Sequence, residues 1–169
     1  MPVTPIAGQD FDARMVTVLA QANAEPSDIL ALVSAWLQEQ CGVRLVTMTQ
    51  RETTDGSFLR LYSSMPDAYA ASGRKPPNQT PWSAQVIDRH ETFVANDYSG
   101  IAATMADHEQ IRALGCESIL NIPIVLRNQV VGTLNCLAGP GHFDERTIAA
   151  CETMRLPVAM ALLLHKQTS

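Results

Sequence analysis

Apolar residues recur at helical spacing in the N-terminal and C-terminal parts of the chain. A first helix is predicted between the cap at Gln9 or Asp10 and the polar break that begins at Asn23, with a stripe of Phe11, Met15, Val18, Leu19 and Ala22. A second runs from Pro26 to Gly42, with a stripe of Ile29, Leu32, Val33, Trp36 and Leu37. A third is predicted from the cap Asp144 to about His165, and Pro157 inside it should remove one backbone hydrogen bond and kink it.

Alternation of apolar and polar residues predicts strands in the middle of the chain. Residues 43–49 and 57–63 flank the turn Thr54-Asp55-Gly56 and should form a hairpin. Residues 117–126 and 130–138 form a clearer hairpin, around a predicted three-residue turn of Arg127, Asn128 and Gln129. Pro123 cannot donate a ladder hydrogen bond, so it should lie at a bulge or an edge.

The remaining segments are short or irregular. Residues 65–80 hold three prolines and few large apolar groups, which predicts a long connection that serves as a lid or binding loop. A short helix should follow over 81–89, then a strand over 92–95, a loop over 97–106 and a short helix from Asp107 to Gly115. This order predicts an α+β fold of three layers, with a central antiparallel sheet and long helices on one face. We expect one domain over residues 10–166, between tails at 1–9 and 167–169.

Composition narrows the functions that are possible. The 169 residues carry 12 basic and 17 acidic side chains and a formal charge of −5, and the basic residues are scattered, so we expect no binding to nucleic acid. The N-terminus resembles no signal peptide, and the strongly apolar run 158–164 is too short to span a bilayer, which favours a cytoplasmic protein that does not enter a membrane. Four widely spaced cysteines without a CxxC pair favour buried thiols over disulfides.

The last predicted hairpin should have two unlike faces. Alternation places Ser118, Leu120, Ile122 and Ile124 on one side, which suits packing against the long helices. The opposite side carries Ile119, Asn121, Thr133 and Asn135. Amides are costly in a core unless a partner satisfies them, so Asn121 and Asn135 are candidates for hydrogen bonds to a ligand. The alternative is that they bond to nearby backbone or water.

The same region resembles the GAF domains, sensory modules of cyclic-nucleotide phosphodiesterases, phytochromes and bacterial regulators. The resemblance covers about residues 10–166 and is most specific at the run SILNIPI (118–124), the GTL of 132–134, and Phe143-Asp144-Glu145 before the last helix. Residues 82–97 also look like the family's short helix, turn and strand ending in Asp. The resemblance implies a ligand pocket floored by the face that carries Ile119, Asn121, Thr133 and Asn135, and walled by Trp82, Phe93, Asp97, Tyr98, Met105, His108 and Ile111.

Four of the wall residues also have a simpler explanation. Trp82 and Phe93 suit an aromatic ligand but equally suit the core. Asp97 ends a strand before a turn, where capping the loop backbone is an alternative to ligand recognition. His108 lies near a helix start, where exposure to solvent competes with a role as donor or acid-base group.

Motifs for catalysis, metals and cofactors are missing from the sequence. The four histidines lie in neither an HExxH nor a CxxC-type grouping, and there is no P-loop, GxGxxG or nucleophile elbow, so no metal or cofactor is expected. The free methionine-R-sulfoxide reductases share the GAF fold, but Ile119, Asn135 and Leu137 stand at their substrate-gripping carboxylates and Arg112 at their attacking cysteine, with Cys116 off register. The signature of cyclic-nucleotide binders is present only as Phe143-Asp144-Glu145, and no cysteine falls where bilin attaches.

These patterns lead to three functional hypotheses. The first is a non-enzymatic sensor that binds an unidentified small molecule, pairs as a homodimer through its first and last helices, and acts on a separate output protein, since the chain ends just after its last helix. The second is a dimerisation or protein-interaction module with a vestigial pocket. The third is the thiol-dependent methionine-R-sulfoxide reductase.

Overall fold

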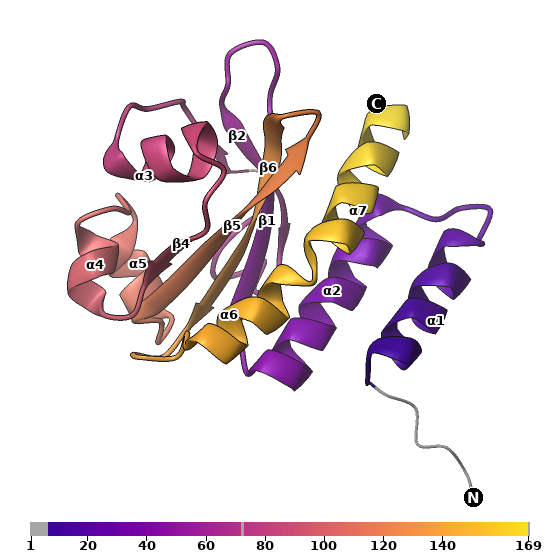
Figure 1. Ribbon diagram of the computed structural model, residues 1–169, viewed down its shortest axis with the longest axis horizontal. Helices are drawn as coiled ribbons and strands as arrows, with labels where there is room; N and C mark the ends of the chain where they lie inside the picture. Colours follow the sequence, from indigo (N-terminus) through magenta and orange to yellow (C-terminus); the bar gives the residue numbers. More distant parts are fainter. Residues whose placement is uncertain (1–6, 72, 169) are drawn as a thin grey trace, which may run out of the picture.

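The computed structural model describes residues 7–71 and 73–168, in which a six-stranded antiparallel sheet separates two layers of helices (Figure 1). The long helices cover one face and the short helices cover the other (Figure 1). The predicted three-layer α+β fold is therefore confirmed. The predicted tails at 1–9 and 167–169 fall partly outside the described residues, although α1 already begins at Ala7 and α7 extends to Thr168.

The helix layer is built from α1 (Ala7–Leu19), α2 (Pro26–Cys41), α6 (Glu145–Glu152) and α7 (Arg155–Thr168). Helix α2 packs along α7 and α1 packs on α2, so α1 is the outermost element (Figure 1). Pro26 occupies the first turn of α2, and Gly42 ends it with a φ of 66°, a left-handed conformation that glycine adopts without strain.

The last predicted helix is two helices. The chain breaks between α6 and α7 at Thr153 and Met154, so Pro157 lies in the first turn of α7, where its missing N–H removes no hydrogen bond. The predicted kink is thus a break a few residues earlier. The stretch Glu145–Lys166 is long enough to cross a membrane, and an 18-residue segment of it has a mean hydropathy of 1.5. In the folded domain, 39% of that segment is buried. A helix that packs into the core of a globular domain meets the same criteria, as this one does through Cys151, Val158 and Leu162.

The strands are β1 (Leu45–Arg51), β2 (Phe58–Ser63), β3 (Arg74–Lys75), β4 (Phe93–Ala95), β5 (Ser118–Leu126) and β6 (Gln129–Ala138). Their order across the sheet is β3-β2-β1-β6-β5-β4. The turn between β5 and β6 has two residues, Arg127 and Asn128, at φ 51° and 62°, so Gln129 belongs to β6 and not to the turn. This geometry matches the right-handed twist of the strands. Pro123 lies beyond the end of β4, where β5 is the edge, as predicted.

The two faces of the sheet differ as the alternation predicts. Leu120, Ile122, Leu134 and Cys136 join the core under the long helices. Ile119 and Leu137 belong to a second cluster on the opposite face, together with Leu45 and residues of the short helices. The predicted strand over 43–49 begins only at Leu45: Val43 precedes it and packs with the helix layer, whereas Leu45 lies on the opposite face.

The second face is covered by α3 (Pro81–Ser83), the π-helical turn η1 (Ala84–Asp88), α4 (Tyr98–Ala102) and α5 (His108–Ala113). The predicted loop over 97–106 therefore contains a helix. The predicted connection over 65–80 contributes strand β3, which pairs with the edge of β2, and a buried Tyr69. Both segments are less irregular than their sequences indicate.

Candidate functional site

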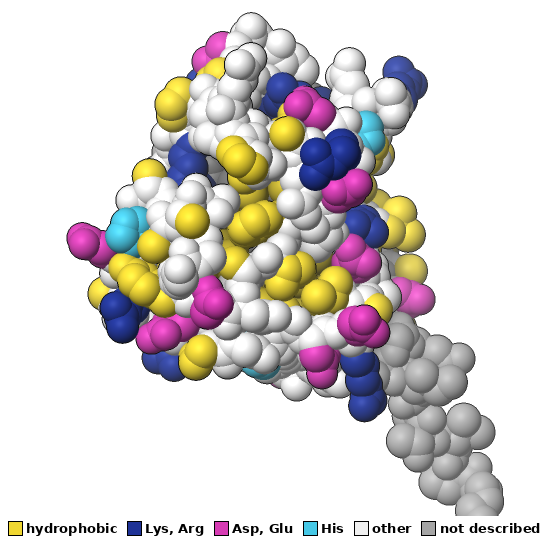
Figure 2. All heavy atoms as spheres, turned by 60° about the vertical axis from the view of Figure 1, so that its left-hand side comes forward, with side chains coloured by type: hydrophobic (Ala, Val, Ile, Leu, Met, Phe, Trp, Pro, Cys, Tyr) yellow, Lys and Arg dark blue, Asp and Glu magenta, His cyan; other side chains and the backbone are white. Residues whose placement is uncertain are grey.

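A cavity of about 630 Å³ opens on the sheet face opposite the long helices. Its floor is formed by β1, β2, β5 and β6, and its walls by the segment 73–83, the turn η1 and residues 104–107 before and at the start of α5. Figure 2 shows hydrophobic side chains around the hollow on this side of the molecule, with charged side chains of both signs nearby. Cavities of a few hundred Å³ are the size that small-molecule ligands occupy.

The strand register arranges the floor in rows that run across the sheet. Because directly paired residues of antiparallel strands point to the same face, each row presents its side chains together to one side of the sheet. The first row is apolar: Leu45, Leu137 and Ile119. The second carries a hydroxyl and two amides: Thr47, Asn135 and Asn121. The third joins a guanidinium to two hydroxyls: Arg60, Thr49 and Thr133. The fourth has two cations around an aromatic ring: Lys75, Phe58 and Arg51.

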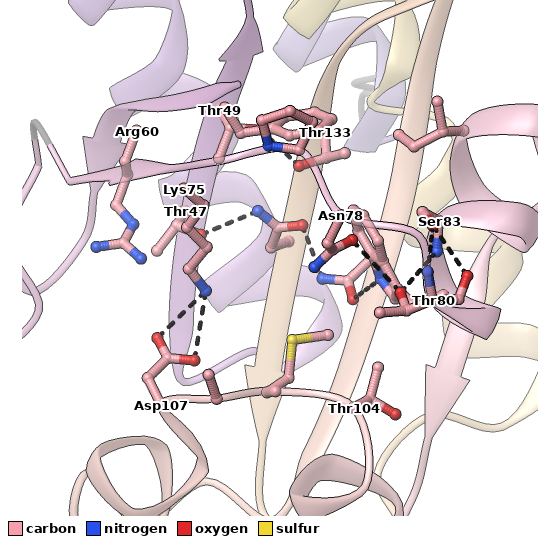
Figure 3. A pocket seen from close by; sticks show the side chains of 18 of the residues that line it. Thr47, Thr49, Arg60, Lys75, Asn78, Thr80, Ser83, Thr104, Asp107 and Thr133 are labelled. Atoms are coloured by element: carbon pink, nitrogen blue, oxygen red, sulfur yellow. Dashed lines mark hydrogen bonds and ion pairs between the residues drawn. The ribbon is translucent and has the colours of Figure 1, made fainter. Parts of the chain in front are cut away.

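The amide row forms a continuous relay of hydrogen bonds (Figure 3). The indole Nε1 of Trp82 donates to Oδ1 of Asn121 over 3.0 Å. Nδ2 of Asn121 donates to Oδ1 of Asn135 over 2.7 Å, and Nδ2 of Asn135 donates to the hydroxyl of Thr47 over 3.2 Å. Each amide keeps a second N–H donor beyond these bonds. The relay therefore fixes the orientations of the two amides. It leaves one N–H of each amide, on a residue that lines the cavity, available to a ligand.

The hydroxyls of Thr49 and Thr133 lie 2.7 Å apart in the next row. Gly132, beside Thr133, lets the strands and α7 come together: a Cβ at this position would collide with the carbonyl oxygen of Thr49 and would lie 2.8 Å from Cδ1 of Leu162. The glycine that the sequence places before Thr133 is thus required by the close approach of both β1 and α7.

The wall that holds Trp82 begins at a helix cap. The Thr80 hydroxyl accepts a hydrogen bond from the Ser83 amide over 3.2 Å, and Pro81 occupies the first helical position. This cap aims the indole ring at the floor, where it lies edge-on to Phe58 with ring centroids 6.1 Å apart. The two rings enclose one side of the cavity.

The opposite wall is charged. Lys75 Nζ lies 3.3 Å from a carboxylate oxygen of Asp107, and the Tyr69 hydroxyl donates to the same carboxylate (Figure 3 shows the ion pair). Burial opposes ionisation of Asp107, but Lys75 and Tyr69 outweigh it and hold the pKa of this carboxyl below its ordinary value. Burial and the adjacent carboxylate raise the pKa of Tyr69, so its hydroxyl keeps its proton and donates.

Seven of the eleven site residues that the sequence nominates line this cavity: Trp82, Met105, Ile111, Ile119, Asn121, Thr133 and Asn135. Phe93, Asp97, Tyr98 and His108 are not among its lining residues. Phe93 packs against the apolar cluster below the cavity. Asp97 accepts from the Gly100 amide over 2.7 Å and caps α4, which is the alternative that the sequence left open.

The remaining two nominated residues form a cluster between α4 and α5. The Tyr98 hydroxyl lies 2.7 Å from Nδ1 of His108, and the Arg112 guanidinium lies 4.3 Å from the centre of the Tyr98 ring. These contacts join two short helices, so the pair holds the wall together instead of facing the cavity. Ile111, on the inner side of α5, is fully buried and lines the cavity as the resemblance implied.

The charged residues of the site were missed in the sequence. Arg60 does occupy an inward position of the predicted strand 57–63, two residues from Phe58, and a charge at such a position was the available signal. Nothing in the sequence pairs Tyr69 with Asp107, because 38 residues separate them and a loop was expected at Tyr69. Asp107 does begin α5 as predicted, yet its side chain binds Tyr69 and Lys75.

The four cysteines are buried and none forms a disulfide. Hydrogen bonding to Cys151 and burial raise the pKa of Cys41, and hydrogen bonding to Cys136 raises that of Cys151. Burial raises the pKa of Cys116. Because the thiolate is the reactive form, the thiols of Cys41, Cys116 and Cys151 are poor nucleophiles. Within residues 7–71 and 73–168, no three His, Cys, Asp or Glu side chains gather where a metal ion could bind.

Comparisons with known proteins agree with this fold. A family model described as "GAF domain" matches residues 23–162. The structure is similar to the GAF domain of a phosphoenolpyruvate-protein phosphotransferase from Coxiella burnetii, with a TM-score of 0.72 and 17% identity over 96% of this chain and 95% of that one. The corresponding domain from Acinetobacter gives 0.69 and 14% identity, with 98% of each chain covered.

A GAF domain of a two-component sensor histidine kinase from Bacillus halodurans gives a TM-score of 0.65 and 16% identity, covering 84% of this chain and 95% of that one. At these identities the likeness concerns the fold alone. No curated protein matches the sequence.

Proposed function

Because the family match covers most of its length, this chain belongs to the GAF domain family, which is generally used in sensing and signalling, and we propose that it is a sensory module that binds a small molecule. One observation carries the proposal: a cavity of about 630 Å³ lies over a floor of hydrogen-bonded amides that still have free donors. An apolar enclosure with a few convergent polar groups is typical of ligand sites.

A fluorescence experiment tests ligand binding. The chain has two tryptophans, and Trp36 contacts Phe11 in the helix layer, on the far side of the sheet from Trp82. The Trp36→Phe variant therefore leaves Trp82 as a reporter at the cavity wall. We expect at least one compound of a metabolite panel to change its emission and to raise the melting temperature.

A blocking variant and its control give this experiment its specificity. Thr49→Phe directs a ring into the cavity from a strand position that favours aromatic residues, whereas Thr54→Phe adds the same ring in the exposed β1–β2 turn. Binding should be lost in the first variant and kept in the second. Equal binding by both, or no response to any compound at millimolar concentration, would refute the proposal.

We further propose that the module forms a homodimer through α1 and α7, and that a separate protein receives the signal. Four large apolar side chains of these helices are exposed: Val16 at 67%, Leu19 at 37%, Leu156 at 69% and Leu163 at 50%. A second copy would cover this surface and complete a helical bundle. Sedimentation should show a dimer that Leu156→Glu and Leu163→Glu dissociate and that Ser99→Glu, at an exposed position of α4 on the opposite face of the sheet, leaves intact. A monomer at high micromolar concentration would contradict this.

A second candidate function is an interaction module with a vestigial pocket. It is favoured by the bonds of Asn121 and Asn135, which run to Trp82, Thr47 and each other. In that case a partner protein would bind equally well to wild type and to Thr49→Phe, with no dependence on added metabolites. Loss of partner binding on blocking the cavity would favour the sensor.

We propose that the protein is not an enzyme. The raised pKa values of Cys41, Cys116 and Cys151 speak against thiol chemistry, and Ile119 and Leu137 occupy positions where the reductases carry carboxylates. No turnover of free methionine sulfoxide with a thiol donor is expected. Turnover that Cys116→Ser abolishes would overturn this expectation.

A further inference from the structure

The charge around the cavity is opposite in sign to that of the whole chain. The protein has a formal charge of −5, yet the described residues that line the cavity include three cations, Arg51, Arg60 and Lys75, against two acids, Asp88 and Asp107. Asp107 is already paired with Lys75 at 3.3 Å and accepts from Tyr69, and Asp88 is exposed at the end of η1. The interior of the site therefore favours negative charge.

Arg60 is the cation that the structure holds in place most firmly. Its guanidinium carbon lies 3.9 Å from the centre of the Tyr69 ring, and its Nη1 donates to the carbonyl oxygen of Ala70 over 2.8 Å. Its Nε is buried and has no hydrogen-bond partner. A buried donor without a partner is costly, and Nε together with Nη2 forms one edge of the guanidinium that matches two oxygens of a carboxylate or phosphate.

Tyr69 links Arg60 to the second cation. Its ring stacks on Arg60 and its hydroxyl donates to Asp107, which in turn holds Lys75 (Figure 3 shows Arg60, Lys75 and Asp107 on one side of the cavity). The Lys75 ammonium has three donors and the side chain is half-exposed, so it can contact an entering anion while it keeps Asp107. Arg51, whose Nε is also buried without a partner, extends the cationic row across the sheet.

The rows of the floor give the ligand a direction. Leu137 and Ile119 lie at the apolar end, the amides of Asn121 and Asn135 lie in the middle, and Arg60 lies toward the β2–β3 edge. A molecule that satisfies all three needs an apolar part, an uncharged polar group and a terminal negative charge.

We propose that the ligand is a small organic anion whose carboxylate or phosphate group binds Arg60 and Lys75, with its polar middle over the two amides and its apolar part against Leu137 and Ile119. This rests on the proposed sensory function and adds the chemical class of the ligand to it.

Paired compounds test the proposal. Low-molecular-weight carboxylic acids and phosphate monoesters are each compared with their neutral amide, ester or alcohol, by thermal shift and by Trp82 fluorescence in the Trp36→Phe protein. Inorganic phosphate and sulfate are included as bare anions. We expect an organic anion to bind at least about tenfold more tightly than its neutral partner, because the charge-assisted hydrogen bonds to Arg60 are lost in the latter.

Matched arginine variants locate the anion site. Arg60→Gln should weaken binding of the organic anion about tenfold or more, and Arg60→Lys should restore part of it. Arg74→Gln is the control, since Arg74 is the neighbour of Lys75 on β3 but bonds to Ser57 and Asp55 outside the cavity. If Arg60→Gln fails to fold, Lys75→Gln at the half-exposed Lys75 provides the same test.

The outcomes separate this proposal from the broader one. If neutral compounds bind more tightly than anions and Thr49→Phe blocks their binding, the proposal of an anionic ligand is wrong, whereas the proposed sensory function is supported. If inorganic phosphate stabilises the protein as much as the organic anions do, the proposal that the ligand is an organic molecule is wrong. Equal binding to Arg60→Gln and Arg74→Gln would overturn the assignment of the anion to Arg60. If no compound binds, both proposals fail.

Discussion

The Asn121–Asn135 relay makes a quantitative prediction about stability. Asn121 is 3% exposed, accepts from Trp82 over 3.0 Å and donates to Asn135 over 2.7 Å. The Asn121→Ala change leaves two polar groups without partners, and each such group costs about 1–3 kcal/mol when it is fully buried. Because the cavity can admit water to both, we expect the lower part of that range, about 2 kcal/mol in all. Urea unfolding followed by circular dichroism measures it.

A double-mutant cycle isolates the bond between the amides. In the Asn121→Ala/Asn135→Ala double variant the unpaired Asn135 oxygen no longer exists, so the loss should fall short of the sum of the single losses by about 1 kcal/mol. Asn23→Ala, in the exposed connection between α1 and α2, is the control and should change stability by less than about 0.5 kcal/mol. Additive single losses, or an Asn121→Ala protein as stable as the control, would refute the reasoning.

Three further changes probe packing, charge and capping. Gly132→Ala should cost about 3 kcal/mol or more, because its Cβ collides with the Thr49 carbonyl; a normal melting temperature would contradict this. Asp107→Asn should cost about 1–2 kcal/mol at neutral pH by losing a charged acceptor. Since the pKa of Asp107 is lowered from 3.8, its stabilisation is present above about pH 4 and lost as the pH falls further, so the gap to wild type should close in acid unfolding curves. Asp97→Ala should cost about 1 kcal/mol through the α4 cap, with no change in ligand affinity in a titration.

The sequence predicts those parts of the fold that depend on long regular patterns. Alternation over 118–124 separates the two faces because each strand buries both sides, so Leu120 and Asn121 must point to opposite layers. Pro26 and Gly42 bracket α2 because helix ends need their particular backbone conformations. Such signals are local, and the elements that they predict are present in the structure.

The parts that the sequence does not predict depend on contacts between distant segments. Strand β3 has two residues and exists because the edge of β2 offers it hydrogen bonds. Tyr69 is buried because Asp107 and Arg60, far away in the chain, accept its hydroxyl and cover its ring. The family resemblance implied that Asp97 and Tyr98 form a pocket wall, but Asp97 caps α4 and the Tyr98 hydroxyl contacts His108 of α5 instead.

Gly132 lies between the proposed ligand cavity and the proposed dimer surface. On one side of β6, Thr133 contributes to the cavity floor, and on the other side α7 approaches Gly132 so closely that an added Cβ would lie 2.8 Å from Leu162. Packed interiors transmit small displacements because they have little free volume. A ligand that shifts Thr133 would therefore act on α7 through a single residue, and α7 carries the exposed Leu156 and Leu163 of the proposed dimer surface. The cavity and that surface are thus separated by one strand and one helix, which is a short route for a signal.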